Sequence, residues 1–333
     1  MKPRLILHIG THKTGSSALQ EVLETERPAL AAAGFLYGAT DRPPFADLPK
    51  HTSLFKALRR GEETFAAERA AIEEEVDRTG AHTLILSEEG LSSPYALAFD
   101  RIGGLSDRFE IEIICYLRRP DRFAESLWNQ FAREGFAREG IAAFLDSDLG
   151  RRHLDLQRNL DFWEGIGALN VFGYEEAAGW IGASGGSVPA EGASGDGAGD
   201  RLGHGIVAHF AAATGVPLPP VNPVHNASPS MSAAAVMVEV NRQRKGEISA
   251  ADWGLLEARL GPERRMTAMG RRLRRDFLDR MAPVMAAWEA RYGVVFPVDM
   301  PEEPDDPIPP ADPELVAWFL EHLRRADAGG VAG

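Results

Sequence analysis

Residues 5–20, LILHIGTHKTGSSALQ, decide the fold of this 333-residue chain. An apolar run with the character of a buried strand comes first, and from Ser16 onward apolar residues return at helical spacing. Between the two, Gly10 and Gly15 bracket a short turn that also carries Lys13. Backbone N–H groups at the start of a helix, together with the helix dipole, attract anions. The stretch therefore predicts a strand–turn–helix unit whose turn binds a phosphate-like group.

The same alternation of buried strands and amphipathic helices continues along the chain. Strand-like apolar runs occur at Leu5–Ile9, Thr83–Leu86, Ile111–Leu117 and Leu169–Phe172, and helical periodicity occurs at Ser16–Thr25, Glu62–Thr79, Asp121–Arg133 and Arg151–Gly165. The strands lack polar alternation, as expected where helices cover both faces of a parallel sheet. The pattern predicts an α/β fold with a central parallel sheet between two layers of helices.

The remaining sequence is predicted to be rich in helices and to belong to one single domain, residues 1–333. A Gly-, Ala- and Ser-rich segment at 179–203 has too little apolar surface to offset its ordering entropy, which predicts a mobile loop. Helical patterns follow at 205–214, 232–245 and 250–260 and in a long charged stretch near 262–292. An extended proline-rich acidic segment at 297–312 and a last helix at 313–326 complete the chain.

Composition and charge exclude several classes of protein. The net charge of −13 argues against a protein that coats nucleic acid or an anionic membrane, because both need a positive surface. No apolar run approaches the roughly 18 residues of a membrane span, and the apolar stretch after the basic N-terminus is too short for a secretory signal. We therefore expect a cytoplasmic chain with no integral membrane segment. The single cysteine, Cys115, is expected to be buried in a strand and cannot form an intrachain disulfide.

The turn at residues 10–17 departs from the ordinary nucleoside-triphosphate loop, G-x-x-x-x-G-K-[ST]. Gly10 and Gly15 have the separation that this loop requires, but Ser16 takes the place of its lysine and Lys13 precedes the second glycine by two residues. A glycine-containing turn at a helix start still favours an anion. Lys13 adds a full positive charge, and Thr14, Ser16 and Ser17 add hydroxyl donors.

A second basic motif follows the third strand-like run, in CYLRRPDRFAESLWNQ at 115–130. Arg118 ends the strand and Ser126 comes eight residues later on the next helix, a spacing that can aim both side chains at one point beyond the sheet edge. The guanidinium group is a planar charged fork that suits phosphate oxygens. Arg119 takes the place of Arg118 if the strand ends one residue later.

The two motifs, in this order, resemble those of sulfotransferases that use 3′-phosphoadenosine 5′-phosphosulfate (PAPS), in particular the bacterial carbohydrate-type branch. The resemblance covers roughly Leu5 to Tyr174 and implies a P-loop-like three-layer fold. It implies that the turn, formed by Gly10, Thr11, His12, Lys13, Thr14, Gly15, Ser16 and Ser17, holds the 5′-phosphosulfate. Lys13 then contacts the bridging oxygen and the sulfonate, and Arg118 with Ser126 grips the 3′-phosphate. Adenosine 3′,5′-bisphosphate is the implied product, and no metal is implied.

Sulfonate transfer also needs a group that removes the proton of the acceptor. The strand end SEEG places Glu88 and Glu89 near the same sheet edge, and Glu89 is the first choice with Glu88 close behind. His51 is the other candidate base, because an imidazole titrates near neutrality. His12 is expected to contact sulfonate or phosphate, and His8 to be a satisfied core residue. The family branch implies a carbohydrate or glycan-linked acceptor, and the oligomeric state stays open.

Two other functions remain open at this point. A divergent P-loop kinase or nucleotidase would use ATP and place magnesium on Ser17 and Glu88, but it leaves Arg118 and Ser126 without a task. A catalytically inactive nucleotide-binding protein would keep the fold and lose the chemistry. Binding of adenosine 3′,5′-bisphosphate in preference to ATP with magnesium separates the sulfotransferase from the kinase.

Overall fold

The computed structural model describes residues 2–39, 49–95, 100–179, 198–219, 230–245, 248–261, 265–297, 299–300 and 303–329. The chain divides into two compact units instead of the single domain expected from the sequence. The sheet unit comprises Met1–Arg119, Asp155–Asn226 and Val284–Pro297, and the helical unit comprises Pro120–Leu154, Ala227–Pro283 and Val298–Gly333.

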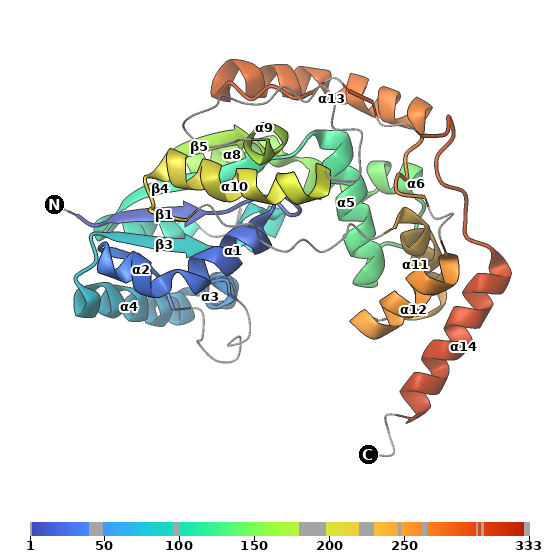
Figure 1. Cartoon of the computed structure of the whole chain (residues 1–333), viewed down its shortest axis with the longest axis horizontal. Coiled ribbons are helices and arrows are strands. Elements are labelled where there is room, and N and C mark those ends of the chain that lie inside the picture. Colours follow the sequence, from blue (N-terminus) through green and yellow to red (C-terminus); the bar gives the residue numbers. More distant parts are fainter. Residues whose placement is uncertain are drawn as a thin grey trace. The chain divides into compact units, whose positions relative to one another are not determined.

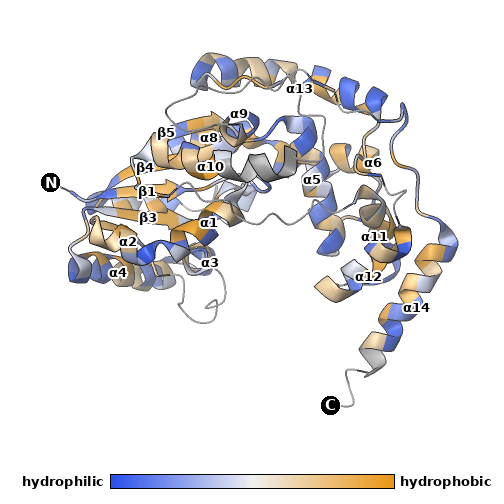
Figure 2. Ribbon diagram, in the orientation of Figure 1, coloured by the Kyte–Doolittle hydropathy of each residue, from blue (hydrophilic) through white to orange (hydrophobic). Residues whose placement is uncertain are grey.

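The sheet unit contains a five-stranded sheet in the order β2-β3-β1-β4-β5, in which all neighbouring strands run parallel. Its strands are β1 Arg4–His8, β2 Phe35–Tyr37, β3 Thr83–Ser87, β4 Glu110–Leu117 and β5 Ala168–Gly173. The register puts His8, the last residue of the central strand β1, beside Ser87 of β3. The predicted α/β class with a parallel sheet is confirmed, and Figure 2 shows how hydrophobic the strands are.

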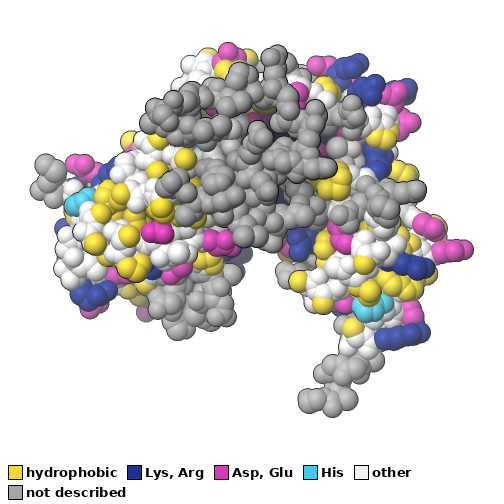
Figure 3. Space-filling view, viewed as in Figure 1, with side chains coloured by type: hydrophobic (Ala, Val, Ile, Leu, Met, Phe, Trp, Pro, Cys, Tyr) yellow, Lys and Arg dark blue, Asp and Glu magenta, His cyan; other side chains and the backbone are white. Residues whose placement is uncertain are grey.

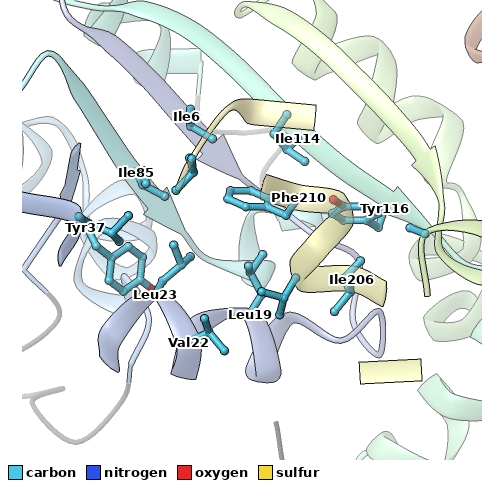
Figure 4. Close-up of a cluster of buried hydrophobic side chains, with 14 residues drawn as sticks. Ile6, Leu19, Val22, Leu23, Tyr37, Ile85, Ile114, Tyr116, Ile206 and Phe210 are labelled. Atoms are coloured by element: carbon cyan, nitrogen blue, oxygen red, sulfur yellow. The ribbon is translucent and has the colours of Figure 1, made fainter. Parts of the chain in front are cut away.

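Helices of different lengths cover this sheet, from the six residues of α2 to the 18 residues of α4. The sheet unit contains α1 Ser16–Thr25, α2 Arg27–Ala32, α3 Thr52–Arg60, α4 Glu62–Thr79, α8 Leu156–Glu164, α9 Tyr174–Ala178 and α10 Ala198–Thr214, with 3-10 turns at Glu89–Ser92 and Asp100–Asp107 (Figure 1). On one face of the sheet, Ile6, Ile85 and Ile114 pack against Leu19 of α1 and Phe210 of α10 (Figure 4). The side chains of the opposite face, such as Leu5 and Leu7, are also fully buried. The sheet is therefore the middle layer of the unit.

Most predicted helix boundaries hold, and three differ. The helix expected near 262–292 begins at Arg271. The helix expected at Arg151–Gly165 is broken into α7 Asp148–Leu154 and α8, because the Asp155 side chain accepts a hydrogen bond from the Arg158 N–H and starts a new helix. Helix α10 begins at Ala198, inside the segment 179–203 that was predicted to be a loop. The rest of that prediction, residues 180–197, lies outside the described residues.

The helical unit contains α5 Pro120–Arg133, α6 Ile141–Asp146, α7, α11 Met231–Gln243, α12 Ala250–Leu260 and α14 Pro313–Gly329. Helix α13, Arg271–Tyr292, has Pro283 in its interior, where the division between the units falls. The unit has a buried ionic centre: Arg274 of α13 pairs with Asp121 at 2.5 Å and Glu125 at 2.9 Å of α5, and with Glu303 at 2.6 Å. These four side chains hold α5, the start of α13 and the segment before α14 together.

None of the described helices has the length and apolar character needed to cross a bilayer. On the part of the described surface visible in Figure 3, acidic and basic side chains are interspersed with hydrophobic ones. Neither observation contradicts the expected absence of an integral membrane segment.

Candidate functional site

The turn between β1 and α1 has the backbone of an anion-binding loop. Gly10, Lys13 and Gly15 have φ angles of 52°, 67° and 75°, in the left-handed region. Lys13 is the one non-glycine residue with a positive φ in the part of the chain that the structure describes. Alternation of left-handed residues with ordinary ones turns successive N–H groups toward one concave side. Gly15 precedes α1 without a side-chain cap, so the first N–H groups of this helix are available to an anion.

Two threonines and the cysteine fix the shape of the turn. The Thr11 hydroxyl donates to the Tyr116 carbonyl of β4 at 2.9 Å, and the Thr14 hydroxyl donates to the Thr11 carbonyl at 2.7 Å. Cys115 Sγ lies 3.7 Å from the Gly10 carbonyl oxygen that it donates to. Both threonine side chains are buried. The hydroxyl of Thr14, predicted to contact a ligand, is instead used inside the turn, and Thr11 anchors the turn to the sheet.

Four side chains of the turn differ sharply in exposure. Lys13 and Ser17 are exposed, His12 is half-buried, and Ser16 is buried. The Ser16 hydroxyl has no hydrogen-bond partner among the described residues. The charge of Lys13 and the hydroxyl of Ser17 are therefore accessible from solvent, whereas the hydroxyl of Ser16 is enclosed by the protein.

Arg118, and not Arg119, lies against the turn. Arg118 Nη1 donates to the Lys13 carbonyl at 3.3 Å, and its guanidinium carbon lies 5.7 Å from the centre of the Tyr174 ring. Arg119 is buried, and its Nη1 donates to the Pro297 carbonyl at 2.7 Å. The alternative that Arg119 replaces Arg118 is therefore not supported, because the Arg119 side chain has a structural role.

Ser126, the predicted partner of Arg118, lies on α5 in the helical unit, whereas Arg118 belongs to the sheet unit. The Ser126 side chain is half-buried. Its predicted contact with the 3′-phosphate stays a prediction.

Glu88 is a structural carboxylate. It is buried, its Oε1 accepts from the Gly90 N–H at 2.9 Å, and its Oε2 accepts from the Thr52 hydroxyl at 3.1 Å. Burial raises the pKa of Glu88 despite the nearby charge of Lys50 and these hydrogen bonds. Both oxygens are thus used to cap the 3-10 turn and to hold the start of α3.

Glu89, the adjacent residue, is partly accessible and ion-paired. Lys50 Nζ lies 3.2 Å from Glu89 Oε1. Burial tends to raise the pKa of Glu89, but the positive charges of Lys50 and His12 outweigh it and hold the pKa below the ordinary value. Glu89 is therefore ionised at neutral pH and lies near His12 of the turn.

His51 does not have the geometry of a general base. It is buried, its Nδ1 accepts from the Ser87 N–H at 2.9 Å, and its Nε2 lies 2.9 Å from the Gly38 carbonyl. Because Nδ1 accepts, Nε2 carries the proton and donates to Gly38. The prediction that His51 takes a proton from the acceptor is corrected: the ring ties the ends of β2 and β3 together.

His8, expected to be a satisfied core residue, is buried but only half satisfied. Its Nδ1 lies 2.8 Å from the Ser87 hydroxyl, and its Nε2 has no hydrogen-bond partner among the described residues. Burial lowers the pKa of His8 to about 4, so the imidazole is neutral at pH 7. The sequence missed this site: its one signal was a polar residue at the end of an apolar run, directly before a glycine turn.

Over the described residues, the structure contains no group of three or more His, Cys, Asp or Glu side chains able to hold a metal ion. No model of a protein family matches the chain, and neither a curated protein nor a solved structure does. The features that bear on function are therefore the turn, Arg118 and the strand end with Glu89. Their geometry provides donors and positive charge for an anion beside an ionised carboxylate.

Proposed function

We propose that this chain is a sulfotransferase that moves a sulfonate group from PAPS to a hydroxyl or amine of an acceptor. The observation that carries the proposal is the contact of Arg118 with the backbone of Lys13, since it joins the two basic motifs, more than a hundred residues apart, at one edge of the sheet. A donor with phosphates at both its 5′ and 3′ positions needs two such anion-binding groups. The resemblance of both motifs to those of sulfotransferases supports the same function.

In the proposed reaction the protein aligns the acceptor with PAPS and polarises the sulfonate group, and it forms no covalent intermediate with either. The acceptor oxygen or nitrogen attacks sulfur, a new bond to sulfur forms, and the bond from sulfur to the 5′-phosphate oxygen breaks. The departing oxygen keeps the bonding electron pair, and adenosine 3′,5′-bisphosphate leaves. Lys13 and the N–H groups of α1 stabilise the negative charge that grows on that oxygen.

The acceptor proton goes to Glu89 in this proposal. Glu89 is ionised and partly accessible, whereas both oxygens of Glu88 and both ring nitrogens of His51 already have partners within the protein. The low pKa of Glu89 makes it a weak base, which suits an acceptor whose proton is lost late in the transfer. From the resemblance to the carbohydrate-type branch alone, we further propose a carbohydrate or glycan-linked acceptor. A cytoplasmic location stays an expectation from the apolar runs of the sequence.

Binding selectivity tests the proposal. Adenosine 3′,5′-bisphosphate should raise the Tm more than ATP with magnesium does, and Arg118→Ala should abolish that preference. Arg108→Ala, at an exposed arginine paired with Asp77, is the matched control and should leave the preference unchanged. A larger shift with ATP and magnesium would contradict the proposal. Sulfonate transfer from PAPS to carbohydrate acceptors then tests the activity.

The hydrogen bonds of Glu88 disfavour the kinase alternative. It requires Glu88 to hold magnesium, directly or through water, but both of its oxygens accept hydrogen bonds from Gly90 and Thr52. No comparable observation favours or disfavours a nucleotide-binding protein without activity, and the transfer assay decides that case.

A further inference from the structure

Two buried polar atoms under the turn lack a hydrogen-bond partner in the described part of the chain: His8 Nε2 and Ser16 Oγ. The two residues are 1% and 4% exposed, so bulk water does not satisfy these atoms. His8 is the last residue of β1, and Ser16 is the first residue of α1. An unsatisfied buried polar group costs about 1–3 kcal/mol, and native proteins contain few of them. Two such atoms, one on each side of the same turn, call for a physical explanation.

Both atoms border the same space beside Gly10. A Cβ atom on Gly10 would lie 2.8 Å from Ser16 Oγ and 3.6 Å from His8 Nε2. A side chain at residue 10 would collide with the serine hydroxyl, and the φ of 52° also favours glycine. Gly10 therefore lies against both polar atoms, and only glycine fits at this position without displacing the serine hydroxyl.

The hydrogen bonds of the Ser87 hydroxyl indicate which nitrogen of the neutral His8 ring carries the proton. Gln20 Nε2 of α1 donates to the Ser87 hydroxyl oxygen at 3.0 Å, and the same oxygen lies 2.8 Å from His8 Nδ1. The hydroxyl oxygen can accept twice, but among the described side chains His8 Nδ1 is the acceptor within hydrogen-bond distance of its own proton, which favours donation from the hydroxyl to Nδ1. A neutral imidazole that accepts at Nδ1 carries its proton at Nε2. The unpartnered Nε2 is thus an N–H donor.

We propose that the Nε2–H group of His8 and the hydroxyl of Ser16 together bind one oxygen of the anionic group held by the turn. This inference rests on the function proposed above for the turn, and it adds a strand residue, His8, to the binding site and Gln20 with Ser87 as the residues that position it. Both groups donate, so the site selects an ionised oxygen, as in a phosphate or sulfonate, over a hydroxyl. Neither donor adds charge, and the positive charge comes from Lys13 and Arg118.

A pair of substitutions at residue 8 tests the role of Nε2 separately from that of Nδ1. The amide nitrogen of glutamine reaches the place of Nε2, whereas that of asparagine reaches only the place of Nδ1. In titration calorimetry with adenosine 3′,5′-bisphosphate, His8→Asn and Ser16→Ala should each raise the Kd by about 10- to 100-fold, as expected for a lost hydrogen bond to a charged group. His8→Gln should stay within a few-fold of the wild type.

His82→Asn is the matched control, because His82 is exposed and precedes the amino end of β3, opposite to the turn. It should leave the Kd unchanged. Thermal denaturation of each variant checks that the fold is kept, and Ser87→Ala tests the positioning role, with a smaller rise in Kd than His8→Asn. Equal affinities for His8→Asn, Ser16→Ala and the wild type would overturn the inference.

The ¹⁵N NMR signals of the histidine rings give a readout that a purely structural role would not change. The His8 pattern should be that of the Nε2–H tautomer, and its Nε2 signal should move on addition of the bisphosphate or of inorganic pyrophosphate, while the His51 signals stay. If the bisphosphate binds and the His8 signal does not respond, the inference fails and the proposed function stands. If only pyrophosphate binds and His8 responds, the anion site is supported and the proposed function fails.

Discussion

Two buried polar clusters, one in each unit, differ in how completely their groups are paired. In the helical unit, Arg274 is fully buried, and its three nitrogens contact Asp121, Glu125 and Glu303. In the sheet unit, His8 and Ser16 are just as deeply buried, yet each has a polar atom without a partner among the described residues. A cluster whose groups are all paired within the protein is explained by its architectural role, whereas buried groups without partners require another explanation. The difference distinguishes a structural cluster from the pair of residues that we propose binds an anion.

The largest effect is expected from breaking the complete cluster. Arg274→Met leaves buried carboxylates without their cation and should lower the free energy of unfolding by about 3–5 kcal/mol. Denaturant unfolding followed by circular dichroism measures this change. Arg280 lies on the same helix as Arg274, and Arg280→Met, which removes its exposed ion pair with Asp146 of α6, should cost less than about 1 kcal/mol. A loss below 1 kcal/mol for Arg274→Met would show that the cluster does not hold the unit together.

The turn should respond in the opposite way, with activity lost and stability kept. Lys13 is exposed, so Lys13→Ala should leave the Tm nearly unchanged. Removing one stabilising charge from the transition state should lower kcat by about 10²–10³ in the sulfonate-transfer assay. Lys13→Arg keeps the charge and should retain more activity. A Tm loss as large as that of Arg274→Met would contradict the distinction between the two clusters.

Glu89 allows a more specific test, because the adjacent carboxylate, Glu88, has both of its oxygens hydrogen-bonded within the protein. Glu89→Gln should lower kcat by about 10²-fold if Glu89 takes the acceptor proton. In the wild type, the pKa of Glu89 lies below the ordinary value of 4.5, so the acid limb of the kcat/KM profile should also lie below pH 4.5.

Lys50→Met should move that limb to higher pH, because the lysine charge helps to keep the pKa of Glu89 low. Lys56→Met, a change at a lysine on α3, serves as the control for loss of one positive charge and should leave the limb in place. A pH profile that Lys50→Met does not alter would remove Glu89 from the mechanism.

The sequence predicted the parts of the fold whose cause is local. The apolar run before Gly10 and the helical spacing after Ser16 predicted β1 and α1 closely, because burial and period are properties of neighbouring residues. Strand β2 was missed because Phe35–Tyr37 is too short to produce a pattern. The break at Asp155 was missed because a cap depends on one side chain and not on the periodicity of the whole helix.

The candidate site could be predicted only as far as residue type and strand order determine it. Arg118 was placed at the correct edge because it directly follows β4. The roles of His51 and Glu88 could not be predicted, since their partners, the Ser87 N–H and the Thr52 hydroxyl, come from segments about 36 residues away. His8 was predicted to be satisfied because nothing near it in the sequence indicates that Ser87 occupies Nδ1 and leaves Nε2 unpartnered.

The smallest effect is expected for Glu88→Gln, on the pH dependence of the unfolding free energy. Comparison with Glu89→Gln tests the difference between the two neighbouring carboxylates directly. Burial raises the pKa of Glu88 in the folded state, so protonation of this group favours the fold. Its contribution to stability is fully present below the unfolded pKa of about 4.5 and is lost as the pH rises through the folded value. Glu88→Gln keeps an oxygen for the Gly90 N–H without the charge, so it should match the wild type near pH 4 and be slightly more stable, by less than about 1 kcal/mol, at pH 8.

Glu89→Gln should show the opposite trend, because the folded pKa of Glu89 is lowered. The ionised form of Glu89 contributes stability above the unfolded pKa, and this contribution is lost as the pH falls through the folded value. The Glu89 variant should therefore be less stable than the wild type at pH 8 and approach it in acid. Unfolding free energies of both variants between pH 4 and pH 8 measure the two slopes. Slopes of the same sign would mean that the two adjacent carboxylates do not differ in the way that their hydrogen bonds and ion pairs require.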